Sequence, residues 1–177
     1  MNQMKAIEIE KITLNVGAGQ PGHPVEKGKI LLQNVSGVKP VETRTGPRTR
    51  IPAWSLRPNL VIGCKVTLRK EQAKIVLAKL LAAKDNQLPI KSFDNNGNFS
   101  FGINEYLDVP DLDYIPEVGI MGFEVAITLQ RKGFRVKRRA LKKKKIPQRH
   151  GISKEEAINF VKENFKIKVV ERGEEEE

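Results

Sequence analysis

The chain has 177 residues, with 32 Lys or Arg against 21 Asp or Glu, so its formal net charge is +11. Its 39% apolar content fits a single folded domain with a substantial core, and its short apolar runs exclude a membrane-spanning helix of about 20 residues. One cysteine excludes an internal disulfide, two histidines argue against a Cys/His zinc site, and the N-terminus lacks a secretion signal.

The positive charge is concentrated in one segment, residues 131–150. This segment holds eleven Lys or Arg and no acid, while the rest of the chain has 21 basic and 21 acidic residues. An imbalance at this density indicates a polyanionic partner, and nucleic acid is the polyanion that fits best.

The first third of the chain alternates between strand and helix patterns. Residues 5–16 have the period of a half-buried strand, residues 17–22 form a turn, and residues 24–37 have the helical period with a proline start and a glycine stop. Residues 39–43 read as a short strand. Residues 44–61, which contain three prolines, predict a long basic loop.

The middle of the chain predicts a strand, a helix and a hairpin. Residues 62–69 alternate strictly, and residues 71–84 predict a helix with an inward face of Ile75, Val76, Leu80 and Ala83. The Asn-Asn-Gly-Asn run at 95–98 is typical of a hairpin turn before a strand at 99–103.

The last third begins with a Pro- and Asp-rich loop at 108–116. A strand follows at 119–130, then the basic segment, and then a helix that opens with Ser153 and Glu156 in a capping-box pattern. A last strand is expected at 167–170.

These elements predict an α+β fold. We expect a single mixed, mostly antiparallel sheet with helices packed on one face, and an exposed RNA-binding face on the other. Residues 1–170 would form one domain, with basic extensions at 44–61 and 131–150, and residues 171–177 an acidic disordered tail.

Residues 17–22 also fit the G-x-G-x-x-G pattern of a dinucleotide-binding enzyme, and Glu42 has the spacing of its ribose-binding acid. Pro21 removes an amide that should face the pyrophosphate, and Pro24 moves the helix start beyond the last glycine. We therefore interpret the motif as a tight turn and expect a protein that is not an enzyme.

Two further groups of residues have alternative interpretations. Cys64 could pair with a histidine as a nucleophile, but a plain strand cysteine is favoured because no signature accompanies it. The acids between 94 and 124 match no calcium loop. They read as a solvated face, with contact to a basic partner as the alternative.

The strand at 62–69 carries the most specific signal. Alternation places Val66 and Leu68 on one face and Lys65, Thr67 and Arg69 on the other. If the apolar face packs on helices, the polar face can donate hydrogen bonds to phosphates and 2′-hydroxyls. An ordinary solvent-facing strand is the alternative.

Five motifs together resemble one family: LNVGAG, GVKPVETRT, IGCKVTLR, SFDNNGNFSFGI and GIMGFEVAITL, in this order. They are similar to the large-ribosomal-subunit proteins numbered five in the universal scheme, the 5S rRNA-binding proteins of the central protuberance. The stretch GFRVKRRALKKKKIPQRHGISKEEA resembles the archaeal and eukaryotic branch.

The resemblance implies a structural role in the large ribosomal subunit, in the cytoplasm, with no cofactor, metal or catalytic residue. It implies contact with 5S rRNA through Asn15, Lys39, Lys65, Thr67 and Arg69. It implies that the loop reaches toward peptidyl-site tRNA with Arg44, Arg48, Arg50 and Arg57. Large-subunit rRNA would be bound by Arg131, Lys132, Arg135, Lys137, Arg138, Arg139, Lys142, Lys143, Lys144, Lys145 and Arg149.

The resemblance also implies an intersubunit bridge with a small-subunit head protein and contact with neighbouring proteins of the central protuberance. Val38 departs from the pattern, because many family members have Gln there. The alternative is a general RNA- or DNA-binding protein outside the ribosome, which would not prefer 5S rRNA over another structured RNA.

Overall fold

A computed structural model describes residues 2–170, so the predicted acidic tail at 171–177 lies outside the described residues. The chain divides into two compact units. Of the described residues, the first comprises 2–12, 69–101 and 126–170; the second comprises 13–68 and 102–125. Among the described helices, none is both long and apolar enough to cross a membrane.

The fold is α+β, as predicted. The helices are α1 (His23–Ser36), α2 (Lys70–Ala82) and α3 (Lys154–Phe165). The strands are β1 (Ile7–Gly17), β2 (Val41–Arg44), β3 (Val61–Leu68), β4 (Gln87–Pro89), β5 (Phe99–Ile103), β6 (Phe123–Arg131) and β7 (Lys168–Val170).

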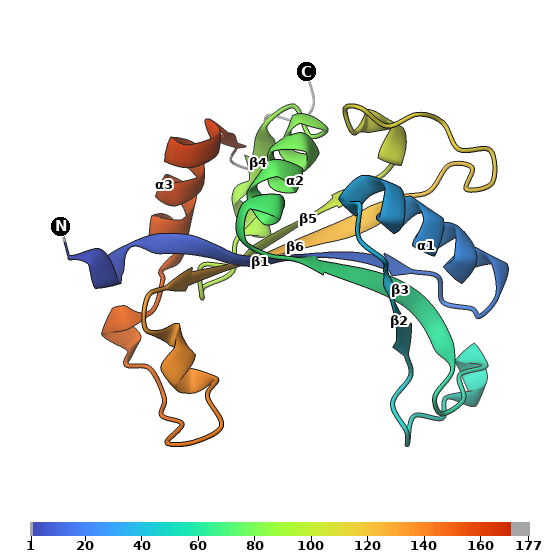
Figure 1. Ribbon diagram of the computed structural model, residues 1–177, viewed down its shortest axis with the longest axis horizontal. Helices are drawn as coiled ribbons and strands as arrows, with labels where there is room; N and C mark the ends of the chain where they lie inside the picture. Colours follow the sequence, from blue (N-terminus) through green and yellow to red (C-terminus); the bar gives the residue numbers. More distant parts are fainter. Residues whose placement is uncertain (1, 171–177) are drawn as a thin grey trace. The chain divides into compact units, whose positions relative to one another are not determined.

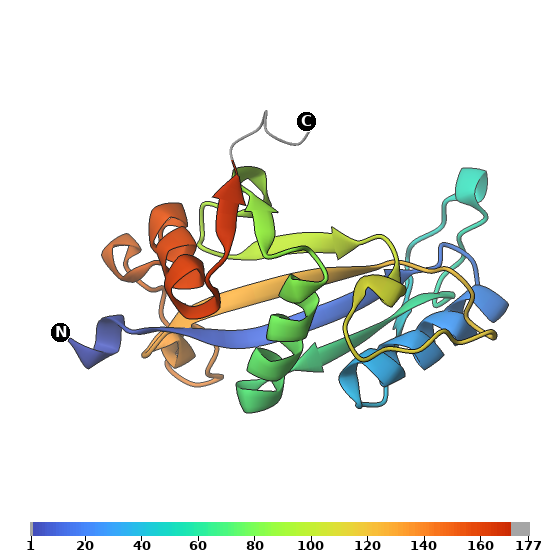
Figure 2. The same ribbon diagram turned by 90° about the horizontal axis from the view of Figure 1, so that it is seen from above.

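Five strands form the main sheet in the order β2-β3-β1-β6-β5. The predicted last strand is confirmed as β7, but it does not join this sheet. It pairs in parallel with β4, and Figure 2 shows the two short strands side by side. The prediction of a single sheet is therefore wrong in this detail, because three residues of β4 were too short a signal to recognise.

In the second unit, α1 covers one face of β3 (Figure 1). The helix predicted at 24–37 is confirmed as α1, and Val25, Gly28, Leu31 and Leu32 are its buried residues. A Cβ at Gly28 would lie 2.9 Å from the Cys64 sulfur. Glycine therefore allows the helix to approach β3 closely, and Cys64 is fully buried beneath it.

In the first unit, the predicted inward face of α2 is only partly right, because Leu80 is buried but Ile75 is not. Ile75 is 60% exposed, and the buried residues are Ala73, Leu77, Leu80 and Leu81. Both sets of residues have helical spacing, because apolar residues lie on two adjacent stripes of this helix. Periodicity alone could not choose between them. The capping box of α3 is confirmed, with Ser153 and Glu156 bonded in both directions.

The long strand predicted from residue 119 begins only at Phe123. Gly119 has a positive φ of 70°, and the amides of Val118 and Gly119 both donate to the Ile115 carbonyl. Residues 115–119 therefore form a turn, so the chain cannot be extended there. Along β6, Phe123, Val125, Ile127 and Leu129 are all buried.

Candidate nucleic-acid interface

The outward face of β3 is polar, as the alternation predicts. Lys65 and Thr67 are exposed, while Val66 and Leu68, which alternate with them along the strand, are buried. Asn15 on β1, in the same unit, is half-buried, and its side-chain amide donates to a Glu124 carboxylate oxygen at 3.2 Å. Asn15 is therefore held in place by a protein acceptor, whereas Lys65 and Thr67 present their polar atoms to solvent.

Lys39 is exposed between α1 and β2, beside a network of three charged residues. Glu42 accepts from Lys29 at 2.7 Å and from Arg44 at 3.1 Å. The Lys29 bond is the main reason that the pKa of Glu42 lies below its usual value and that of Lys29 above it. Glu42 thus forms ion pairs with both Lys29 and Arg44, and its carboxylate partly neutralises the charge of Arg44.

The glycine-rich turn uses its amides internally. The backbone N–H groups of Ala18 and Gly19 both donate to the Ile62 carbonyl, at 3.0 and 3.1 Å. These donors are therefore unavailable to a pyrophosphate. Because Glu42 is also engaged, the arrangement disfavours a dinucleotide site and supports the interpretation as a tight turn.

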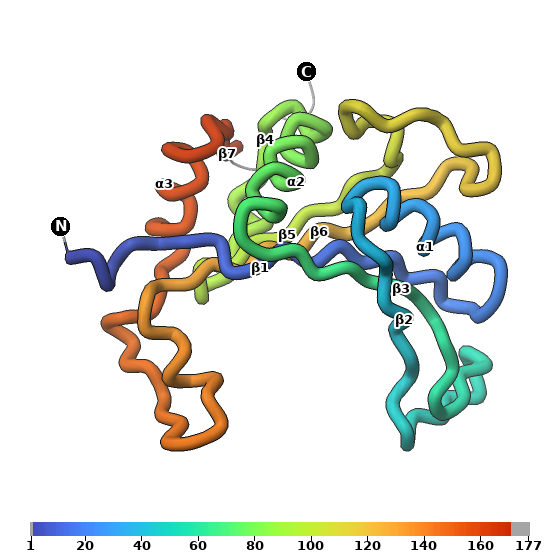
Figure 3. Tube along the Cα trace, viewed as in Figure 1, coloured from blue at the N-terminus to red at the C-terminus, as the bar shows by residue number. Residues whose placement is uncertain are grey.

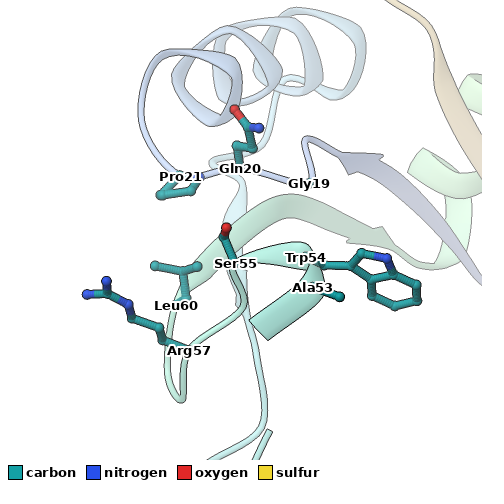
Figure 4. Close-up of a pocket in the computed structure, with 8 residues that line it drawn as sticks. All are labelled: Gly19, Gln20, Pro21, Ala53, Trp54, Ser55, Arg57 and Leu60. Atoms are coloured by element: carbon teal, nitrogen blue, oxygen red, sulfur yellow. The ribbon is translucent and has the colours of Figure 1, made fainter. Parts of the chain in front are cut away.

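A pocket of about 580 Å³ lies between this turn and the β2–β3 connection. Figure 4 shows Gln20 and Pro21 on one side and Ser55 and Leu60 on the other, with Trp54 also among the residues that line the pocket. Trp54 is 72% exposed.

The basic loop between β2 and β3 has internal order. Thr45 is buried, and its hydroxyl donates to the Arg57 carbonyl at 2.5 Å and accepts from the Leu60 amide at 2.8 Å. Ile51 and Leu56 form an antiparallel bridge nearer the tip. The four arginines assigned to this loop are exposed: Arg44, Arg48, Arg50 and Arg57.

The basic extension 131–150 forms a long loop that connects the end of β6 to α3 (Figure 3). Arg131 does not belong to its solvent-facing surface. This residue is 5% exposed, and its guanidinium donates to Glu156 at 2.6 Å. The structure therefore takes Arg131 out of the exposed cationic surface and makes it a partner of α3.

Two further cations of the extension are paired with acids of β1. Glu10 is 9% exposed and accepts from Arg138, with Arg69 3.6 Å away on its other carboxylate oxygen. Lys132 lies 4.0 Å from Glu8. These carboxylates were missed as internal partners. The alternation along β1 could have predicted that Glu10 is buried, because it lies on the same face of the strand as the buried residues that follow it.

The remaining eight cations of the extension are exposed and lack a carboxylate partner among the described residues. They are Arg135, Lys137, Arg139, Lys142, Lys143, Lys144, Lys145 and Arg149. Phe134 anchors the segment, with its ring 5.9 Å from that of His150 and 4.5 Å from the Lys137 ammonium. The result is a dense positive surface on a folded support.

Comparisons with known proteins agree with this architecture. The family model that describes the C-terminus of the ribosomal L5 family matches residues 61–160. The chain is 45% identical over 170 residues to the large ribosomal subunit protein uL5 of Sulfolobus acidocaldarius, covering 96% of this chain and 94% of that protein. It is 48% identical over 172 residues to uL5 of Sulfurisphaera tokodaii, covering 97% and 96%. With uL5 of Nanoarchaeum equitans, identity is 44% over 168 residues, covering 94% and 98%. Similarity at this level over nearly the whole length shows that the chain belongs to the uL5 family of large ribosomal subunit proteins.

Proposed function

We propose that this chain, a structural component of the large ribosomal subunit, binds 5S rRNA and large-subunit rRNA and helps to attach 5S rRNA in the central protuberance. Membership of the family supports the ribosomal, cytoplasmic location. The observation that carries the RNA-binding proposal is the set of eight exposed cations on the extension that have no carboxylate partner among the described residues.

The two RNA contacts would have different roles. The extension supplies affinity for large-subunit rRNA by neutralising phosphates. The outward face of β3, with Lys65 and Thr67, offers few charges on a rigid strand and is suited to recognising the shape of 5S rRNA. Asn15, Lys39 and Arg69 are assigned to this contact as well, with Arg69 lying beside Glu10.

Two further contacts are part of the proposal. The β2–β3 loop, with its exposed arginines and Trp54, would reach toward peptidyl-site tRNA, where an exposed ring can stack on a base. The protein would also meet a small-subunit head protein at an intersubunit bridge and contact its neighbours in the central protuberance.

A gel-shift titration with 5S rRNA and an unrelated structured RNA of equal length tests the proposal. Wild-type protein should prefer 5S rRNA. The double variant Lys65→Ala/Thr67→Ala should lose about tenfold in affinity for 5S rRNA, on the order of one good contact. Lys162→Ala, on the exposed side of α3, serves as the matched control and should bind normally.

Two results would contradict the proposal in different ways. Equal affinity of wild-type protein for both RNAs would indicate a general nucleic-acid-binding protein. Undiminished 5S rRNA affinity of the double variant would show that the outward face of β3 is not the contact.

A further inference from the structure

A second concave surface lies entirely within the first unit, and three of the exposed cations of the extension line it. This groove has a volume of about 920 Å³ and lies between the turn at 94–98 and the basic extension. One wall carries the side-chain amides of Asn95 and Asn98, and the other carries the cations Lys137, Lys145 and Arg149. Its size is within the range of pockets that hold small ligands.

The asparagine wall is held rigidly. The turn is closed by the Asp94 amide donating to the Asn98 carbonyl at 2.8 Å and by the Gly97 amide donating to the Asp94 carbonyl at 3.0 Å. A Cβ at Gly97 would lie 2.5 Å from a methyl carbon of Ile152, so the turn packs directly against the residues before α3. The backbone that carries the two amides is therefore held in place.

The cationic wall is also supported from within. The ring of Phe134, which lines the groove, lies against His150, and the His150 Nε2 atom is 3.0 Å from the Lys132 carbonyl oxygen. The Lys137 ammonium lies 4.5 Å from the Phe134 ring centroid. An aromatic face and a set of cations thus share one side of the groove.

An unpartnered buried donor lines the same groove. Arg131 is 5% exposed, and its Nη2 atom donates to Glu156, but its Nε–H has no acceptor in the described part of the chain. Buried donors are almost always hydrogen-bonded, because leaving one unpaired is costly. Because the Nε atom is itself buried, an acceptor on an occupant of the groove would reach it only if the Arg131 side chain shifts.

The amides on the opposite wall are also available. Asn96 donates to the Asp94 carboxylate at 3.2 Å, but the side chains of Asn95 and Asn98 make no hydrogen bond within the described residues. An asparagine amide offers a donor and an acceptor side by side, which complements the N6/N7 edge of adenine.

We propose that this groove binds an unpaired nucleotide of ribosomal RNA, with its phosphate on Lys137, Lys145 and Arg149 and its base edge on Asn95 and Asn98. Four cations, including Arg131, against the single carboxylate Glu156 favour an anionic occupant. A duplex backbone would need only an exposed array of cations, whereas an unstacked base needs a concave site with edge-reading groups. The inference rests on the proposed binding of rRNA and adds a site for one extruded base, adenine in the best case.

The test uses the full-length protein and two probes of equal length and charge, a ten-nucleotide oligoadenylate and the corresponding abasic oligomer. Fluorescence anisotropy should show that wild-type protein binds oligoadenylate about tenfold more tightly, the effect of one good base contact. Asn95→Ala/Asn98→Ala should remove this preference. Asn164→Ala on α3, outside the groove, should retain it.

Ultraviolet cross-linking followed by mass spectrometry gives an independent readout. The oligoadenylate should cross-link to peptides that contain Phe134 or residues 145–149. Equal binding of both probes by wild-type protein, an undiminished preference in the double variant, or cross-links confined to other peptides would each overturn the inference. Failure of the rRNA proposal itself would appear separately, as wild-type protein with no preference for 5S rRNA. The double variant should unfold thermally as wild type does, because Asn95 is exposed and Asn98 half-buried.

Discussion

The pairing of Arg131 with Glu156 makes a quantitative prediction for the stability of the first unit. Glu156→Gln keeps an acceptor for the Ser153 amide and so preserves the capping box, but it removes the negative charge opposite the buried guanidinium. The variant therefore isolates the charge of Glu156 from its role at the start of α3. We expect it to lower the free energy of unfolding.

The magnitude follows from the exposure of the two partners. Removing one partner of a fully buried pair costs about 3–5 kcal/mol. Here the Arg131 side chain is 5% exposed but that of Glu156 is 45% exposed, so solvent screens part of the interaction. We expect a loss of about 2 kcal/mol, within the range for a hydrogen bond to a charged group. Glu156→Ala should lose roughly 1 kcal/mol more, because the capping box is lost as well.

The effect should also depend on pH. The pKa of Glu156 lies below its usual value of 4.5, first because the Ser153 amide donates to it and also because Arg131 is close. A lowered pKa in the folded state means that the charge stabilises the fold above the unfolded pKa. This stabilisation is lost as the pH falls through the folded pKa. Wild type and Glu156→Gln should therefore converge in stability as the pH falls well below 4.5.

Urea unfolding at pH 7 and at low pH, analysed by linear extrapolation, measures both effects. Glu163→Gln is the matched control, because Glu163 is exposed on the same helix. A loss below about 0.5 kcal/mol for Glu156→Gln at pH 7, the usual range for a surface substitution, would refute the argument. Arg131→Met should also lower stability, because it leaves Glu156 without its cationic partner.

Three other perturbations have definite expected outcomes. Gly97→Ala should destabilise the protein by about 1–3 kcal/mol in urea unfolding, because φ is 76° and the added methyl would meet Ile152; a stability equal to wild type would contradict the close packing. Cys64 should resist alkylation by iodoacetamide at pH 8 until urea is added, because it is fully buried and burial raises the pKa of its thiol; rapid labelling of native protein would argue against this. Thr45→Val removes the two side-chain hydrogen bonds at the base of the basic loop, so limited trypsin digestion should cut residues 46–59 faster than in wild type, with unchanged cleavage as the contrary result.

Much of the fold could be predicted because local signals agree with packing. The strict alternation at 62–69 predicted both faces of β3, and Ser153 with Glu156 predicted the start of α3. The inward face of α2 could not be predicted, because two apolar stripes satisfy the same period. The separate pairing of β4 with β7 depends on contacts between distant segments, which leave no local pattern.

The candidate site was only partly predictable for a related reason. Charge density identified the basic extension, since it is a property of composition. Which cations lack a carboxylate partner depends on where the acids of β1 and α3 lie in the fold. The structure shows that three expected RNA-binding residues, Arg131, Lys132 and Arg138, have such partners. The groove beside Asn95 and Asn98 depends on Gly97 meeting Ile152, a contact between residues 55 positions apart.

The internal bonds of the basic extension have a thermodynamic consequence for RNA association. The Lys144 amide donates to the Val136 carbonyl, and the Arg139 side chain donates to the Lys142 carbonyl, so the backbone is already arranged before RNA arrives. Ordering a residue costs about 1–2 kcal/mol in backbone entropy, and an extension that is already folded avoids most of that loss at the moment of binding. Calorimetry should then show a heat-capacity change that reflects surface burial alone, without the larger negative change of a segment that folds on its partner.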